Sequence, residues 1–201
     1  RTGFGIAFVT VFCGLVIGGL AGAFAGTFGG LWEMILMRLV DVVFSFPGLL
    51  LNLFILSLVK TPSVGHLVFA LVITSWAGFA RVARGQALEL RSREFIVAAR
   101  AMGASGSRIL FAHVLPNILP PLIVQASFSF AAYLLVEAGL SFLGIAPISV
   151  SWGQLIAQGS RYLLVAPHLA IFPGACLGLC VLGANLLGDG LRDLWDRHLS
   201  Q

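Results

Sequence analysis

SREFIVAARAMGASGSRILFAHVLPN, residues 92–117, is the longest polar interruption in an otherwise apolar chain, and its position decides the fold. The stretch is basic, rich in small residues, and closed by Leu115-Pro116-Asn117. The sequence on either side of it is typical of membrane-spanning helices. This segment must meet water between two spans, yet it carries Ala98-Ala99 and Gly103, where another backbone can approach closely. We therefore expect it to dock onto something.

The composition of the whole chain is that of a membrane protein. Of the 201 residues, 59% are hydrophobic and only 10% are charged, and the mean hydropathy is +1.01. Ordinary globular chains carry about 25% charged residues, so a soluble domain is excluded. The net charge of +4 indicates orientation in the membrane rather than binding to nucleic acid, because Lys and Arg concentrate on the cytoplasmic side. Since the sequence opens on Arg1 and has no cleavable signal peptide, we expect a piece of a longer protein.

The charged residues divide the chain into segments that predict an all-α, multi-pass membrane protein with five transmembrane helices. A spanning helix needs roughly 20 apolar residues, and the predicted spans are 3–26, 34–59, 64–83, 113–136 and 162–188. Close helix packing is predicted in the first span from small residues at positions 14, 18, 22, 25 and 26.

The basic residues predict how these spans are oriented. With the basic loop and the C-terminus in the cytoplasm, nine of the twelve basic residues lie inside. An even number of crossings must then follow Arg108, so only two of the later runs can span. Residues 138–166 are therefore predicted to form an extracytoplasmic loop or a re-entrant segment.

Two kinds of residue are unusual inside the predicted spans. Arg38 and Asp41 are three residues apart on one helix face, and we expect them to pair near the membrane boundary. The alternative is that one of these charges lines a transport path. Prolines are expected to kink the spans, because proline lacks the N–H and crowds the preceding turn; they are Pro47, Pro116, Pro120, Pro121 and Pro173.

No nucleotide or metal site is expected within this chain. Its single lysine, Lys60, follows LFILSLV, whereas a phosphate-binding P-loop requires GxxxxGK[ST]. Cys13, Cys176 and Cys180 lie in apolar runs without a nearby His or carboxylate, so we interpret them as small buried hydrophobic residues. Energy for uphill transport must then come from a partner protein or from an ion gradient.

Specific residues suggest two alternative functions. Gly103-Ala104-Ser105-Gly106 matches the GxSG of intramembrane rhomboid proteases, with Ser105 as nucleophile. The motif lies in the basic loop, and His168 falls on the opposite side of the predicted topology, so the protease is disfavoured. An ion-coupled secondary transporter needs ionisable groups near the middle of the bilayer, whereas Asp41 and Glu137 lie close to span ends.

The basic stretch itself predicts two short helices. Ser92 is expected to cap the first, Glu94 lies in its first turn, and Gly103 should end it. Ser105 or Ser107 would cap the second, which leads into the fourth span. Such helices are typical either of an amphipathic segment on the lipid surface or of a docking site for a soluble partner, and the pattern does not decide between them.

The same stretch resembles the EAA motif, the coupling loop of permease subunits of bacterial ABC importers. That pattern is EAA, three residues, Gly, nine residues, and Ile-x-Leu-Pro; Ala98-Ala99, Gly103 and Leu115-Pro116 have the matching spacing. Val97 replaces the Glu, and His113 replaces the Ile. VAARAMGAS, HVLPNILPPLIVQ, EAGLSFLGI, SWGQLI and NLLGDGLRD resemble more narrowly the C-type subunit of dipeptide, oligopeptide, opine and nickel importers.

This resemblance implies a single permease domain of the type I importer fold over residues 1–201, with the family's further N-terminal helix outside this sequence. It implies an inner-membrane subunit that has no enzymatic activity and holds no cofactor. A second homologous permease would complete the pathway, and two cytoplasmic ATPases would bind ATP and Mg. An extracytoplasmic binding protein would deliver the substrate, and movement of the ATPases would drive alternating access.

The resemblance also implies which residues act. Residues 92–112 form the cytoplasmic coupling region, in which the implied ATPase contacts are Glu94, Val97, Ala98, Ala99, Arg100, Gly103, Ala104 and Ser105. With Val97 in place of the motif's acid, Glu94 one turn earlier can partly replace that contact. In the outer segment, Trp152 and Gln154 are implied to meet the binding protein.

Overall fold

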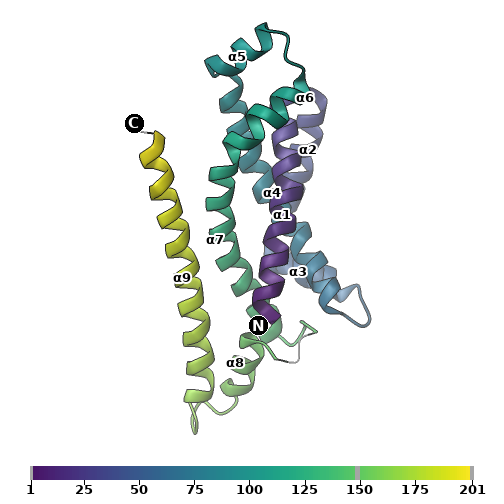
Figure 1. Cartoon of the computed structure of the whole chain (residues 1–201). Helices are drawn as coiled ribbons and strands as arrows, with labels where there is room; N and C mark the ends of the chain where they lie inside the picture. The colour runs from purple at the N-terminus through teal and green to yellow at the C-terminus, as the bar shows by residue number, and fades with distance from the viewer. Residues whose placement is uncertain (1, 148–149, 200–201) are drawn as a thin grey trace.

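The computed structural model describes residues 2–147 and 150–199, and every regular element in this part of the chain is helical. The elements are α1 (Thr2–Phe28), α2 (Gly30–Phe44), α3 (Gly48–Ser57), α4 (Val64–Arg91), α5 (Glu94–Ala101), α6 (Gly106–Arg108), the π-helix η1 (Ile109–Val114), α7 (Leu115–Phe142), α8 (Trp152–Ser160) and α9 (His168–Leu199). The long helices α1, α4, α7 and α9 run along the molecule, with α5 and α6 at one end and α8 at the other (Figure 1). We call these the α5 end and the α8 end; the last turns of α9 lie toward the α5 end.

The helices have the dimensions of membrane spans. Four helical stretches are long and apolar enough to cross a bilayer: Thr2–Phe28, Val64–Arg91, Gly106–Phe142 and His168–Trp195. The pair α2 and α3 is a fifth candidate, with a bend of 86° at its break. The predicted all-α membrane fold is therefore confirmed, with five spans when the bent pair is counted as one.

Residues 138–166, the predicted extracytoplasmic segment, contain the end of α7 and one short helix, α8. α8 has nine residues, which is about 14 Å of helix, whereas the hydrocarbon core is about 30 Å thick. α8 is thus too short to cross. The extracytoplasmic location of residues 138–166 stays a prediction.

The α1–α4 contact is built on a stripe of glycines in α1. The stripe has one glycine every fourth residue, at Gly14, Gly18, Gly22 and Gly26. A methyl group added to Gly18 would overlap the carbonyl oxygen of Trp76, and one added to Gly22 would overlap that of Ala80. Glycine is therefore required at both positions for the two backbones to approach this closely.

The largest apolar core lies between α1, α4, η1 and α7. Its buried members are Val11, Ala23, Phe79, Ala83, Ala87, Ile96, Ile109, Leu110, Val114, Ile118 and Leu122. Ile96 belongs to α5, so the short helix at the α5 end shares the core of the long helices. A smaller cluster joins α1, α7 and α9 through Ala7, Leu134, Ala138 and Leu177.

Ion pairs hold α2 against α4, and they correct one prediction. The pairing of Arg38 with Asp41 was wrong: Asp41 pairs with Arg81 of α4, with 3.0 Å between Oδ1 and Nη2. The Arg81 guanidinium also lies 4.3 Å from the centroid of the Phe44 ring. The Arg84 side chain pairs in the same way with Glu33, and its Nε donates to Oε1 at 2.6 Å. Packing of α2 on α4 brings these groups together and so decides the partner.

The predicted bounds of the third and fourth spans were too short. α4 continues to Arg91, well beyond residue 83, and the helix of the fourth span begins at Gly106 rather than near His113. Arginines do not end α4, because their aliphatic stems lie along the helix while their charged groups reach the carboxylates of α2.

The prolines occupy different positions in their helices. Pro47 is the N-cap of α3, at the 86° break of the bent pair. Pro120 and Pro121 lie inside α7, and Pro173 lies inside α9. Immediately before Pro116, the Leu115 N–H donates to the carbonyl of Leu110, five residues back, as in a π-turn. Kinks at the prolines within α7 and α9 stay predictions.

Gly18→Ala is expected to weaken the α1–α4 contact, because the added methyl group meets a backbone oxygen that cannot rotate away. Overpacking of this kind costs about 1–3 kcal/mol. The measurement is the apparent Tm of the detergent-solubilised protein, read by size-exclusion chromatography after heating. Gly5→Ala is the matched control, since Gly5 lies on the same helix with nothing within 4 Å of the new methyl group. Equal Tm values for the two variants would contradict the glycine contact.

Reversing one charge of the Arg84–Glu33 pair is expected to lower stability. Two like charges would then lie side by side, and both side chains are partly buried. Arg84→Glu and Glu33→Arg should each lower the apparent Tm, and the double variant should recover part of the loss. Neighbouring charges typically couple by about 0.5–3 kcal/mol. If the two single effects simply add in the double variant, the pair does not hold α2 in place.

Candidate functional site

Ser92 and Arg93 connect α4 to α5. Ser92 is the C-cap of α4, and its Oγ donates to the carbonyl of Glu89 at 2.9 Å. The expectation that Ser92 caps the start of the short helix was therefore wrong; Arg93 occupies that position without a side-chain cap. Arg93 Nη2 instead donates to Glu89 Oε1 at 2.7 Å, which ties the start of α5 back to α4.

The α5 helix has a buried face and an exposed face. Ile96 is 1% exposed and Ala99 is 5% exposed, so these two residues, three apart, pack into the molecule. Val97 is 55% exposed and Met102, just after the helix, is 83% exposed. Met102 does not belong to the predicted ATPase-coupling set. Within that set Ala99 is buried and Ala104 is partly buried, and the exposed members are Glu94, Val97, Ala98, Arg100, Gly103 and Ser105. An eight-residue helix with apolar groups on both faces is suited to contact two bodies at once.

Gly103 ends α5 by a backbone conformation that few residues adopt. Its φ is +84°, the left-handed region that glycine enters without steric cost. The Gly103 N–H donates to the carbonyl of Arg100, and the Ala104 N–H donates to that of Ala99, both at 3.0 Å. Together these bonds form a Schellman motif, so the structure has a glycine stop where the sequence predicts one.

Ser105 caps the helical segment that follows. Its Oγ accepts a hydrogen bond from the Arg108 N–H at 3.3 Å and lies 3.1 Å from Ser107 Oγ. Neither partner is a histidine, and within residues 2–147 and 150–199 no hydrogen bond joins Ser105 to one. The hydroxyl thus begins a helix, and its surroundings do not resemble those of a protease nucleophile.

The buried face of α5 connects to two spans. Ile96 packs in the same cluster as Ala83 and Ala87 of α4 and Ile109 and Val114 of η1. On the α7 side, Phe95 lies beside His113, with 6.4 Å between ring centroids. Displacement of α5 would therefore push on α4 and on the η1–α7 helix together.

At the α8 end, two glycines bring α8 onto its neighbours. A methyl group on Gly153 would overlap the backbone of Ala138 in α7, and one on Gly159 would meet the backbone of Leu169 and Ala170 in α9. Trp152 is only partly exposed, and its ring makes an edge contact with Phe4 of α1, with centroids 5.4 Å apart. The predicted contacts of Trp152 and Gln154 with a binding protein stay predictions.

Glu137 is the buried carboxylate of the long helices. It is 1% exposed and accepts a hydrogen bond from Ser141 Oγ at 2.8 Å, one turn nearer the end of α7. A methyl group on Gly3 would lie 2.7 Å from its Oε2, so α1 covers it. The salt bridges among the described residues are Arg81–Asp41, Arg84–Glu33 and Arg93–Glu89, and none of them includes Glu137.

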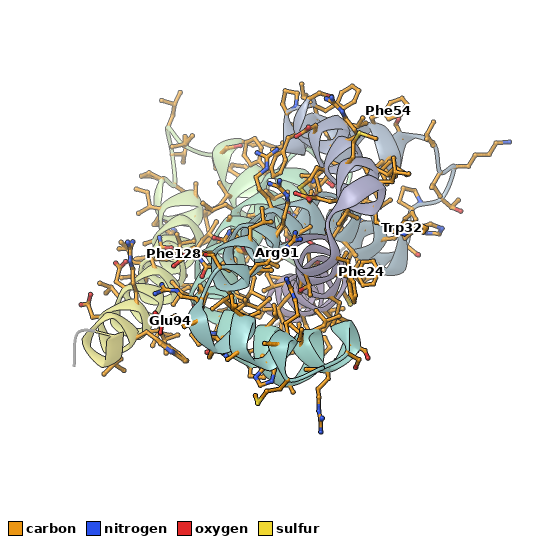
Figure 2. The ribbon with its side chains drawn as sticks, turned by 90° about the horizontal axis from the view of Figure 1, so that it is seen from above. Phe24, Trp32, Phe54, Arg91, Glu94 and Phe128 are labelled. Carbon is orange, nitrogen blue, oxygen red and sulfur yellow. The ribbon has the colours of Figure 1, made fainter. Side chains whose placement is uncertain are left out.

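An open cleft of about 1200 Å³ lies behind α5 and was not predicted from the sequence. Its walls come from α4, the first turn of α5, α7 and α9, and its lining includes Gln86, Glu94, Val124, Gln125, Phe128 and Arg192. The signal in the sequence is Gln125, the only amide side chain between residues 118 and 136. Figure 2, which looks down on the α5 end, shows Glu94 and Phe128 on the side of α9 and Phe24 and Trp32 on the opposite side.

The described residues contain no cluster of three His, Cys, Asp or Glu side chains that could hold a metal ion. The three cysteines have free thiols, but the interpretation of them as buried was wrong: Cys176 is exposed, and Cys13 and Cys180 are partly exposed.

The fold is similar to that of a solved transporter subunit. A structure titled as an inward-facing conformation of the MetNI methionine ABC transporter aligns with a TM-score of 0.77 and 21% sequence identity. The alignment covers 96% of this chain and 92% of that chain. At this level of identity the similarity shows the fold alone.

Curated relatives are closer in sequence. A glutathione transport system permease protein, GsiD, from Escherichia coli is 39% identical over 188 residues, which cover 92% of this chain and 62% of the relative. A dipeptide transport system permease protein, DppC, from Alkalihalophilus pseudofirmus is 37% identical over 199 residues, which cover 98% of this chain and 65% of the relative. The chain thus spans less than two thirds of the length of either relative.

The family match covers nearly all of the chain. Residues 4–201 match the family described as "binding-protein-dependent transport system inner membrane component". The long apolar helices agree with an inner-membrane location. The chain therefore belongs to the family of inner-membrane components of binding-protein-dependent transport systems.

Proposed function

We propose that this chain is a permease subunit of an ATP-driven importer and that α5 docks on a partner ATPase. One observation carries the proposal: one face of α5 is buried in the core that α4 and η1 share, whereas the other face of α5 is exposed. Val97 and Ala98, which occupy the first two positions of the EAA pattern, are both exposed on this other face. A helix placed in this way can receive a push on one face and deliver it to two spans through the other.

The proposal requires partners that supply what the chain lacks. Lys60 is the only lysine and is not part of a P-loop, so ATP and Mg would be bound by two ATPase subunits. A second, homologous permease would complete the pathway, and the family description supports a binding protein as the source of substrate. The α5 end and the C-terminus would then face the cytoplasm, where basic residues concentrate.

The substrate we propose is of the peptide class. The relatives named above transport glutathione and dipeptides according to their names, and both molecules contain peptide bonds. Selection of the substrate would rest largely with the binding protein, which would approach the α8 end. There α8 is in contact with both α7 and α9, so a protein bound to it would bear on two spans.

Transport would proceed by alternating access. Closure of the ATPase pair on ATP would move the docked α5 helices together, and each would carry α4 and the η1–α7 helix with it through Ile96. A change driven in this way needs contacts that differ between the two states. The exposed side chains of Val97 and Met102 can provide such contacts, because they can touch a different part of the ATPase surface in each state.

Val97→Asp tests the docking face. The substitution places a charge where an apolar contact is proposed, and a buried unpaired charge typically costs several kcal/mol. Purified complexes should therefore lose ATPase subunits, and uptake should fall by about tenfold or more, since 1.4 kcal/mol is already tenfold. Val165→Asp is the matched control for ATPase retention, because this valine is 87% exposed at the α8 end, away from α5. Retention of the ATPases by the Val97 variant would refute docking through this face.

Gly103→Val tests the end of α5 separately from its surface. No atom lies within 4 Å of an added side-chain carbon, so the substitution acts through φ of +84° and not through a clash. A bulky residue in this region costs of order 1–3 kcal/mol, and we expect weaker coupling between ATP hydrolysis and uptake. Gly103→Asn should be milder, because asparagine tolerates this conformation. Equal ATP-to-substrate ratios for both variants would show that the turn is not required.

A further inference from the structure

The cleft behind α5 reaches deep into the membrane-spanning part of the molecule. Glu94 and Phe95 of α5 line its outer rim, and Phe128 of α7 lines its inner part. Phe128 lies 13 residues after Leu115, which is about 20 Å along α7, and the hydrocarbon core is about 30 Å thick. The cleft therefore connects the α5 end with the middle of the bilayer.

The walls of the cleft change in chemistry with depth. Its rim carries charges of both signs, with Glu89 paired to Arg93 at 2.7 Å, and with Glu94 and Arg192 beside them. The deeper wall on α7 is uncharged, and its polar side chain is Gln125. The Gln125 Nε2 donates to Ser129 Oγ at 3.4 Å, which leaves its amide oxygen without a donor among the described residues.

A second hollow, on the opposite side of the chain, has an almost wholly apolar lining. It lies between α1, α2 and η1, measures about 530 Å³, and is lined by Leu20, Phe24, Trp32, Leu39, Phe111 and other apolar residues. Phe24 and Trp32 are seen there in Figure 2, away from Glu94 and Phe128. An amide oxygen that accepts no hydrogen bond is costly in hydrocarbon, so the two hollows suit different media. The groove suits acyl chains, and the cleft suits water and a polar solute.

From these observations we infer that the cleft between α4, α7 and α9 is the α5-end half of the substrate passage, in which Gln125 contacts the amide groups of a small peptide-like solute. This inference rests on the proposed function and adds to it the face of the chain that lines the passage. The uncharged inner wall suits a solute of no large net charge, and the oxygen of Gln125 can accept from its N–H groups. Because Glu94 and Phe95 form the rim, displacement of α5 changes the mouth of the passage directly.

Cysteine labelling in the complete transporter tests this passage. In a background with Cys13, Cys176 and Cys180 replaced by alanine, single cysteines are introduced as Gln125→Cys and Val124→Cys in the cleft, Arg93→Cys at the rim, and Leu186→Cys on α9. Leu186 is 69% exposed but does not line the cleft. Inside-out membrane vesicles are treated with a charged methanethiosulfonate reagent, with and without ATP and vanadate to trap the closed ATPase pair.

We expect the two cleft positions to react about tenfold faster than Leu186→Cys, because the reactive thiolate forms in water and not in hydrocarbon. Trapping should slow the labelling of the two cleft cysteines by a similar factor, while Arg93→Cys should still react. Slow reaction at both cleft positions would overturn the inference, and so would fast reaction that trapping leaves unchanged, since that is the behaviour of a static crevice. Failure of the proposed function differs from both, because the purified protein would then retain no ATPase and ATP would not support uptake.

Discussion

The contact of α1 with α4 is the constraint on which the other helices depend. Lipid gives apolar helices little reason to associate, so close backbone approach must supply the attraction. The glycine stripe of α1 provides it, with Gly18 and Gly22 lying against backbone carbonyls of α4. α4 then holds α2 through two ion pairs and continues beyond them to the turn that starts α5. A separation of α1 from α4 would therefore loosen the support of α5 as well.

Ile96 is the most deeply buried residue of α5 and packs it against this framework. It is 1% exposed and shares a cluster with α4, η1 and α7, whereas its neighbour Val97 is 55% exposed. The Schellman turn at Gly103 and the Ser105 cap then reverse the chain within a few residues. α5 is thus held at both ends and on one face, and its other face is exposed. The docking that we propose would use this exposed face.

Local features of this molecule could be predicted from the sequence, and those that depend on distant neighbours could not. The spans followed from composition, and the glycine stop at Gly103 followed from a conformation that favours one residue type. Ser92 was assigned to the wrong helix because a serine hydroxyl can bond backward as readily as forward. The Asp41–Arg81 pair joins residues 40 positions apart, and no spacing rule within one helix contains that information.

The cleft illustrates the same limit. Its walls come from four helices, and the amide of Gln125 was visible in the sequence only as an exception within an apolar run. The contacts that the ATPases and the binding protein would make involve other chains, so the residues predicted for them depend on partners as well as on the fold.

A further glycine contact limits how far α9 can part from α7. Gly153 and Gly159 hold α8 against α7 and α9 at one end. Further along α9, a methyl group on Gly188 would lie 3.1 Å from the Phe128 ring of α7, so the two helices also meet beside the cleft. From Gly188 to Leu199, α9 has about 17 Å of helix, so a rotation of about 10° at Gly188 would move its last turn by about 3 Å. Bending in this last part of α9 would thus change the mouth of the cleft by roughly the diameter of a water molecule, while the packing around α8 stayed as it is.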